Sequence, residues 1–178
     1  YNPSGTLSRC EFCKMAVYAM CRSGELGKYR AVTIFPDVKP SYWAAAYINL
    51  AAKGNQIIAG YPDGRFYPDR TVTCGQAVSI LVRLLGYTVE DVGGVFPDSY
   101  LAQAATVGLT DGLSLSGGAA LTRGQAARLF LNLLRCDQKD GTSYAGSIAA
   151  VEDGVMLISS SAAAADGTDT AMQIGSGA

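Results

Sequence analysis

The sequence contains no histidine, and this absence excludes most of the familiar catalytic arrangements. Without an imidazole there is no Ser-His-Asp or Cys-His pair, and the commonest general base is missing. Carboxylates remain, but the acidic residues Asp63, Asp111, Asp153 and Asp166 each precede a glycine, and Asp-Gly is typical of tight turns. We therefore expect no catalytic residue and no enzyme activity.

The chain also has no long apolar run and no excess of positive charge. No stretch approaches the roughly 18 apolar residues that a membrane-spanning helix needs, and no charged segment with an apolar stretch precedes Tyr1 as a targeting signal would. The net charge of −1 over 178 residues, without a basic run, argues against a nucleic-acid partner. We expect one sizeable core with a small appendage, no membrane span and no nucleic acid.

A helix-start signature occurs three times, at Ser8 to Glu11, Thr73 to Gln76 and Thr122 to Gln125. Each is a capping box, in which the hydroxyl accepts a hydrogen bond from the backbone three residues on and the Glu or Gln side chain reaches back. Apolar residues follow each box at the same helical offsets: Phe12, Ala77 and Ala126; Met15, Ile80 and Leu129; Ala16, Leu81 and Phe130; Ala19, Leu84 and Leu133; Met20, Leu85 and Leu134. This internal repeat predicts three equivalent helices that bury one common seam.

The last two boxes are preceded by the same kind of segment. Upstream of the second box lie Phe35-Pro-Asp37, a helical stretch from about Tyr42 to Lys53 closed by Gly54, and a turn-rich loop from Gly60 to Asp69. Upstream of the third box lie Phe96-Pro-Asp98 and a shorter helical stretch. The repeating unit is thus a helix, a turn-rich loop and a capped helix.

These units resemble the S-layer homology repeats of bacterial cell-surface proteins, whose pattern runs Phe-x-Asp-Val, Trp-Ala, Gly-Tyr-Pro-Asp-Gly-x-Phe-x-Pro and Thr-Arg-Ala-Glu. Residues 35–87 carry nearly all of this pattern. Residues 1–23 match only the second half of a repeat, and residues 96–136 form a contracted repeat that lacks the tryptophan and the long loop. Because the first repeat is incomplete, we expect the natural protein to continue upstream.

The resemblance implies a mainly α-helical fold in which three repeats form a pseudo-threefold bundle over residues 1–136. It also implies a non-catalytic, extracellular module that needs no cofactor. Such a module binds secondary cell-wall polysaccharide, often through a pyruvylated sugar, in grooves between repeats, and it holds its protein on the outside of a bacterial cell wall.

The resemblance also suggests which residues take the ligand. An acidic sugar suits a forked arginine and backbone N–H groups at a helix start. Arg9 and Arg123 stand one residue after their caps, at the Arg of the family motif, whereas Cys74 holds that place in the second repeat. A first-turn arginine opposes the helix dipole, which favours a ligand role over a solvated surface charge. The other candidate sugar-binding residues are Asp37, Trp43, Gly60, Tyr61, Gly64 and Gln125.

Several of these candidates also have a purely structural interpretation. Trp43 can stack on a sugar face, but it shares a helical face with Tyr47 and Ile48, which favours partial burial in the core. Asp37 is either a turn residue or an acceptor for sugar hydroxyls. The glycines of the long loop suit turns with positive φ, and they would also let a ligand approach the backbone.

Five cysteines are open to more than one interpretation. Cys10 and Cys13 form a C-x-x-C, but zinc usually needs a second pair or histidines, so we expect no metal site. If the capped helices run parallel, Cys10 lies level with Cys74 and Cys21 lies level with Cys136, which makes two disulfides plausible. Free thiols that pack as small apolar groups in the helix seam explain the same residues equally well.

The composition changes after Cys136. Residues 137–146 are interpreted as a linker, and residues 147–178 are rich in Ala, Ser and Gly with almost no charge. Within them Ser147–Val151 and Val155–Ser159 flank an Asp-Gly turn, which predicts a β-hairpin. A lone hairpin is marginal in water, so this tail is expected to dock on the helices, to continue into a further domain or to pair with another chain.

A second function from a different class stays open, which is a structural subunit of an S-layer or extracellular filament. The incomplete first repeat leaves apolar helix surface uncovered, and an apolar β edge can add to a neighbouring chain. A third, a cell-surface hydrolase, would need a catalytic domain outside these residues. The three-repeat interpretation expects Phe12 and Met15 to be buried against the other two capped helices.

Overall fold

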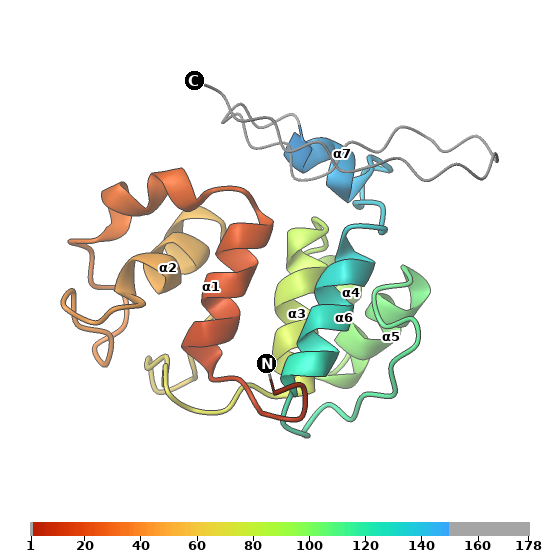
Figure 1. Cartoon of the computed structure of the whole chain (residues 1–178), viewed down its shortest axis with the longest axis horizontal. Helices are drawn as coiled ribbons and strands as arrows, with labels where there is room; N and C mark the ends of the chain where they lie inside the picture. Colours follow the sequence, from red (N-terminus) through yellow and green to blue (C-terminus); the bar gives the residue numbers. More distant parts are fainter. Residues whose placement is uncertain (1, 150–178) are drawn as a thin grey trace.

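In the computed structural model, residues 2–149 are described, and their regular secondary structure is helical, with turns and loops between the helices (Figure 1). This confirms the mainly α-helical fold, and within this range the β-pairing consists of isolated bridges. The elements in chain order are α1 (Arg9–Ala19), η1 (Ser23–Tyr29), α2 (Ala45–Asn49), η2 (Leu50–Gly54), α3 (Cys74–Leu84), α4 (Val89–Val92), α5 (Asp98–Thr106), α6 (Arg123–Leu133) and α7 (Tyr144–Ala149).

The three capped helices α1, α3 and α6 begin where the sequence predicts, directly after Ser8, Thr73 and Thr122. Each has both hydrogen bonds of a capping box. At the first box the Glu11 N–H donates to the Ser8 hydroxyl at 3.3 Å, and the Ser8 N–H donates to the Glu11 carboxylate at 2.8 Å. Each cap therefore satisfies N–H groups that a helix start leaves without a partner, which fixes the start of the helix.

The segments that lead into the capped helices are hydrogen-bonded to one another in a closed ring. The isolated β-bridges join residue 6 to 122, residue 8 to 71, and residue 73 to 120. The first two N–H groups of each capped helix also donate to carbonyls of the segment that leads into the next capped helix. The donor and acceptor pairs are Arg9 to Arg70 and Cys10 to Pro68 for α1, Cys74 to Ala119 and Gly75 to Gly117 for α3, and Arg123 to Gly5 and Gly124 to Pro3 for α6. The three helix starts consequently lie at the same end of the molecule, with α1, α3 and α6 side by side (Figure 1).

The apolar stripes of these helices form the centre of the core. Phe12 is fully buried, and its ring centroid lies 5.4 Å from that of Phe130 on α6. Leu81, Leu129 and Leu133 are also fully buried. Met15 packs against the same core but is only partly buried. The predicted burial is therefore confirmed for Phe12 and holds only in part for Met15.

Two outer helices flank the capped ones, with α2 packed on α1 and α5 packed on α3 (Figure 1). The helix predicted over 42–53 begins later, at Ala45, and ends in the wider turn η2. Trp43 lies before the first turn of α2 and is 54 % exposed. The expected burial of Trp43 was wrong because the residue precedes the helix and does not share its buried face.

The C-terminal part of the described chain differs from the prediction. Asp137 and Ser143 form a β-bridge, and α7 then begins at Tyr144, inside the expected linker 137–146. Residues 147–149 continue this helix and are not a strand. Tyr144 is buried and its hydroxyl donates to the Ala19 carbonyl at 3.1 Å, so it fastens α7 to the end of α1. The rest of the predicted hairpin lies outside the described residues.

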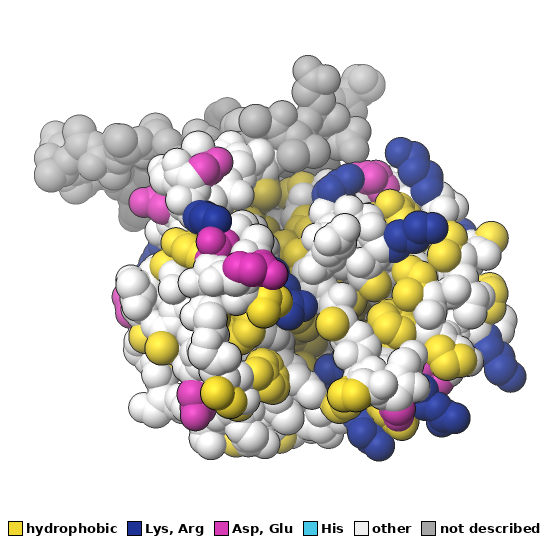
Figure 2. All heavy atoms as spheres, turned by 180° about the vertical axis from the view of Figure 1, so that it is seen from behind, with side chains coloured by type: hydrophobic (Ala, Val, Ile, Leu, Met, Phe, Trp, Pro, Cys, Tyr) yellow, Lys and Arg dark blue, Asp and Glu magenta, His cyan; other side chains and the backbone are white. Residues whose placement is uncertain are grey.

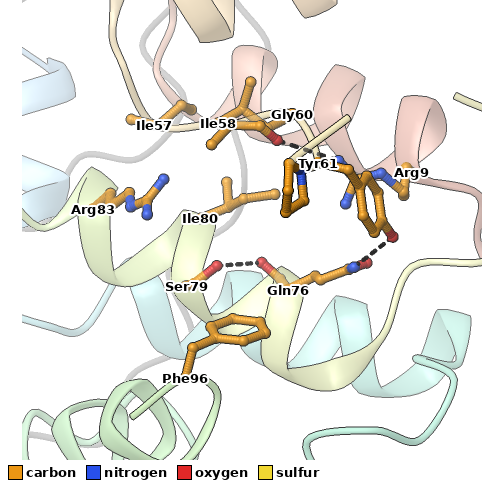
Figure 3. A pocket seen from close by; sticks show the side chains of 12 residues that line it. Arg9, Ile57, Ile58, Gly60, Tyr61, Gln76, Ser79, Ile80, Arg83 and Phe96 are labelled. Carbon is orange, nitrogen blue, oxygen red and sulfur yellow. Dashed lines mark hydrogen bonds between the residues drawn. The ribbon is translucent and has the colours of Figure 1, made fainter. Parts of the chain in front are cut away.

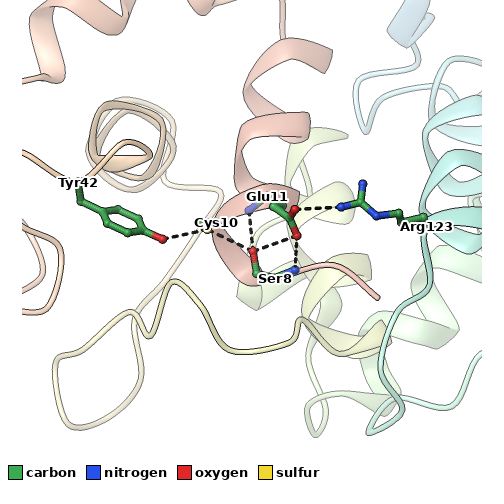
Figure 4. Close-up of polar contacts among 5 residues, drawn as sticks. All are labelled: Ser8, Cys10, Glu11, Tyr42 and Arg123. Atoms are coloured by element: carbon green, nitrogen blue, oxygen red, sulfur yellow. Dashed lines mark hydrogen bonds and ion pairs between the residues drawn. The ribbon is translucent and has the colours of Figure 1, made fainter. Parts of the chain in front are cut away.

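All five cysteines are free thiols, so the pairs Cys21–Cys136 and Cys10–Cys74 are absent from the structure. The Cys136 thiol donates instead to the Val107 carbonyl at 3.2 Å. The Cys10 sulfur lies 3.2 Å from the Ser8 hydroxyl and 3.3 Å from that of Tyr42 (Figure 4). Burial raises the pKa of the Cys13, Cys74 and Cys136 thiols, as expected for small groups packed in the core.

Neither a membrane-spanning helix nor a metal site is found in the described part. No helix within residues 2–149 is long and apolar enough to cross a bilayer. No group of three Cys, Asp or Glu side chains in the same range is arranged to hold a metal ion.

Candidate binding groove

A cavity of about 270 Å³ lies between the loop over residues 57–62 and α3 (Figure 3). The α3 side supplies Gln76, Ser79, Ile80 and Arg83, whose spacing puts them on one helix face. Arg9 from the start of α1 and Phe96 from just before α5 complete the lining. From behind, the surface is hollowed between the two halves of the molecule, and apolar side chains line the hollow (Figure 2).

Arg9 is built into the wall of this cavity. It is only 6 % exposed, and its Nε donates to the Phe66 carbonyl at 2.8 Å and its Nη2 to the Ala59 carbonyl at 3.4 Å. Its guanidinium lies 4.8 Å from the Tyr61 ring centroid and 4.5 Å from that of Phe66. Burial lowers the pKa of Arg9. These contacts tie the loop to α1, so Arg9 sets the shape of the cavity.

Arg123 does not line the cavity. Its Nη2 lies 2.9 Å from Oε1 of Glu11, where it bridges the starts of α6 and α1 (Figure 4). The hydrogen bond from the Ser8 backbone lowers the pKa of Glu11, with a further contribution from Arg123. The two arginines expected to share one role therefore have different surroundings.

The helix starts also differ from the expected anion site. The first two N–H groups of α1, α3 and α6 donate to backbone carbonyls, and the third donates to the capping hydroxyl. These donors are occupied within the protein. The expectation that helix-start N–H groups receive the acidic ligand is corrected for this reason.

Tyr61 and Gln76 meet at one edge of the cavity. The Gln76 Nε2 donates to the Tyr61 hydroxyl at 2.8 Å (Figure 3), while its Oε1 accepts from the Thr73 N–H at 3.3 Å. The capping residue of α3 therefore also positions the loop tyrosine. Gln125, its equivalent in α6, caps Thr122 in the same way but lies outside this cavity.

Asp37 and the two loop glycines hold the loop itself. The Asp37 carboxylate accepts from the Phe66 N–H at 2.9 Å and the Tyr67 N–H at 2.7 Å. A Cβ at Gly60 would lie 2.6 Å from the Phe35 ring, and Gly64 has a φ of +78°. These contacts match the structural interpretation, in which the residues shape the turn.

Nine of the twelve lining residues were not predicted as binding residues, among them Gln76, Ser79, Arg83 and Phe96. Arg83 Nη2 donates to the Tyr100 hydroxyl at 3.3 Å, and the Ser79 hydroxyl donates to the Gln76 carbonyl at 2.8 Å. Phe96 is 52 % exposed. Ser79 and Arg83 follow Gln76 by three and seven residues, which places them beside the apolar stripe of α3. This helical spacing is the sequence signal that could have identified them.

Trp43 belongs to a different surface, made with Lys14, Tyr18 and Tyr47. The Lys14 Nζ lies 5.7 Å from the Trp43 ring centroid, 5.8 Å from that of Tyr18 and 5.6 Å from that of Tyr47. The Tyr18 and Tyr47 hydroxyls are 3.3 Å apart. The structure therefore does not bring Trp43 together with Tyr61 and Arg9 in the cavity.

Comparison with known proteins agrees with the sequence pattern of the full repeat, residues 35–87. Residues 34–78 match the S-layer homology domain. The chain is 31 % identical over 150 residues to the middle cell wall protein of Brevibacillus brevis, across 83 % of this chain and 14 % of that protein. It is 32 % identical over 116 residues to the surface layer protein of Brevibacillus choshinensis, across 64 % of this chain and 10 % of that protein.

A third relative is the cellulosome-anchoring protein of Acetivibrio thermocellus, at 29 % identity over 86 residues, 48 % of this chain and 19 % of that protein. The chain thus spans less than a fifth of each of these three relatives. Residues 34–78 of this chain carry an S-layer homology domain, which confirms the resemblance seen in its sequence.

Proposed function

We propose that the chain is a non-catalytic anchoring module that binds cell-wall polysaccharide in the groove between the 57–62 loop and α3. The S-layer homology domain and the cell-wall and surface-layer names of its relatives support a location at the bacterial cell surface. The observation that carries the proposal is the cavity itself, which a buried arginine and a capping glutamine hold in shape.

The composition of the cavity suits a sugar ring. Ile57, Ile80 and Phe96 supply apolar surface for the ring face, and Gln76 and Arg83 supply polar groups for its substituents. Small-molecule sites commonly combine mostly apolar walls with a few placed polar groups. Arg9 acts here by positioning Tyr61 and the loop.

We further propose that residues 1–136 form a three-repeat, pseudo-threefold module. The support is the ring of hydrogen bonds, in which the same two donors of each capped helix reach the segment leading into the next one. All three repeats border the groove in this arrangement, because the loop and α3 belong to residues 35–87, Arg9 belongs to the first repeat and Phe96 belongs to the third.

Retention on cell-wall sacculi tests the binding function. The protein should sediment with sacculi and should stay in solution once the secondary polysaccharide has been removed from them. Phe96→Ala should weaken retention by about three- to tenfold, since it removes apolar surface from the cavity. Val95→Ala is the matched control, because Val95 is 78 % exposed and does not line the cavity. Equal retention before and after removal of the polysaccharide would contradict the proposal.

A structural subunit that self-assembles is the second candidate, and one observation favours it. The helix expected to be uncovered, α1 of the incomplete first repeat, is instead covered by α2. Among the described helices α5 likewise covers α3, whereas α6 leaves Leu131 41 % exposed. An uncovered apolar helix face promotes association. Analytical ultracentrifugation decides this point, because a subunit shows a mass that rises with concentration and an anchor stays monomeric.

A further inference from the structure

We infer that the binding groove continues past Arg83 into a second cavity, so that it takes at least two consecutive sugar residues, with Arg83 recognising an acidic group at the junction. This inference rests on the proposed polysaccharide binding. The second cavity has a volume of about 280 Å³, and both cavities are lined by Ile57 and Arg83. The two spaces therefore adjoin across the same pair of side chains.

The size of each cavity supports a ligand longer than one sugar. Each is slightly smaller than the roughly 300–1,000 Å³ typical of ligand sites, and the two together fall within that range. The α3 residues that line one cavity or the other run from Gln76 to Leu84. Eight residues of α-helix span about 12 Å, which is longer than one pyranose ring.

Arg83 is the cation best suited to meet an anionic ligand in this groove. The ion pairs among residues 2–149 are Arg22 with Glu25, Arg123 with Glu11, and Lys139 with Asp91, and none of them involves Arg83. Its hydrogen-bond partner is the neutral Tyr100 hydroxyl. The other guanidinium in the first cavity, that of Arg9, already donates to two backbone carbonyls. A carboxylate on the sugar would therefore be bound by Arg83.

The far wall of the second cavity is built by residues 137–149, which we call the C-terminal arm. Tyr144, Ser147 and Ile148 of α7 line it, together with Gln138. Tyr144 is held in place by its hydrogen bond to Ala19. The segment expected to be a linker thus supplies part of the binding surface, with apolar and polar groups close together.

Two variants test separately the contribution of Arg83 at the junction and that of the second cavity. Arg83→Gln removes the charge, and Arg135→Gln is its control, because Arg135 is exposed and lines neither cavity. Ser147→Trp fills the second cavity from an exposed position. Gly146→Trp is its control, since a Cβ there meets only Ser143 at an ordinary 3.6 Å and Gly146 lines neither cavity.

Binding is measured by calorimetric titration with polysaccharide purified from Brevibacillus brevis cell walls and with its fragments of one and of four sugars. The same fragments are also titrated after their carboxyl groups have been reduced to alcohols. Wild type should bind the four-sugar fragment at least tenfold more tightly than the single sugar. Ser147→Trp should abolish that gain and leave single-sugar binding unchanged. Arg83→Gln should bind the acidic fragments about ten- to a hundredfold more weakly than wild type does, and it should bind the reduced fragments with the same affinity as wild type.

The outcomes distinguish this inference from the function on which it rests. If wild type binds neither the intact polysaccharide nor any fragment, the proposed function is wrong and the extended groove falls with it. If wild type binds but Ser147→Trp matches it on the four-sugar fragment, or Arg83→Gln keeps the full preference for acidic fragments, the extended groove alone is overturned.

Discussion

The guanidinium of Arg123 lies 2.9 Å from the carboxylate of Glu11, and this ion pair joins the first turns of α6 and α1 (Figure 4). The same carboxylate closes the capping box of α1 by accepting from Ser8. The boxes of α3 and α6 have glutamine at this place, in Gln76 and Gln125, and therefore have no equivalent charge, whereas the box of α4 has Asp91, which pairs with Lys139. Glu11 thus combines a local capping role with a contact between the first and last capped helices.

Arg123→Ala should change stability little. Both side chains of the pair are about 40 % exposed, at 41 % and 39 %, and exposed ion pairs contribute about 0.2–1 kcal/mol because water and salt screen them. Polysaccharide affinity should stay within about twofold, since Arg123 does not line the cavity. Urea unfolding and calorimetry measure the two effects. A tenfold loss of affinity without unfolding would instead support the ligand role suggested by the sequence.

Glu11→Gln should preserve the cap and remove the pH-dependent part of its stability. The folded-state pKa of Glu11 is lowered by the hydrogen bond from Ser8, so its contribution is fully present above the ordinary glutamate pKa of about 4.3 and is lost as pH falls through the lower folded value. Wild type should therefore exceed the variant in stability at pH 6, and the difference should shrink below about pH 4. A difference that stays constant from pH 6 to pH 3 would contradict this account.

All five cysteines should react with an alkylating reagent in denaturant without prior reduction. In the native protein Cys13 should be unreactive, because it is fully buried and its raised thiol pKa disfavours the thiolate. Mass spectrometry of peptides gives both answers. A peptide pair linked through Cys21 and Cys136 would show that oxidation draws those residues together, against the free thiols of the structure.

Tyr144→Phe should lower the free energy of unfolding by about 0.5–1.5 kcal/mol, because one partly buried hydrogen bond to Ala19 is lost. Tyr144→Ala should cost about 3–5 kcal/mol, because the buried ring leaves a cavity, and it should also release α7 from α1. Hydrogen exchange should then accelerate in residues 137–149. Unchanged exchange there in the alanine variant would show that other contacts hold the arm.

The elements that the sequence predicts well are those with local causes. The starts of α1, α3 and α6 follow from capping boxes four residues long, and the burial of Phe12 follows from the helical period. Trp43 was misjudged because a short shift of a helix boundary changes which face a residue occupies. The helix α7 was misjudged because its residues were interpreted as a linker and a strand, whereas Tyr144 fastens them to α1. The partners of Arg9 lie 50 and 57 residues away in sequence, so its structural role depends on tertiary contacts that no local pattern reveals.

Chemical-shift mapping tests the central claim most directly. Purified cell-wall polysaccharide is titrated into the 15N-labelled protein, and the amide signals that move are assigned. Binding in the groove predicts the largest changes at residues 57–62 and along the α3 face from Gln76 to Arg83. Changes confined to the surface of Lys14, Trp43 and Tyr47, or no changes at saturating polysaccharide, would contradict the account.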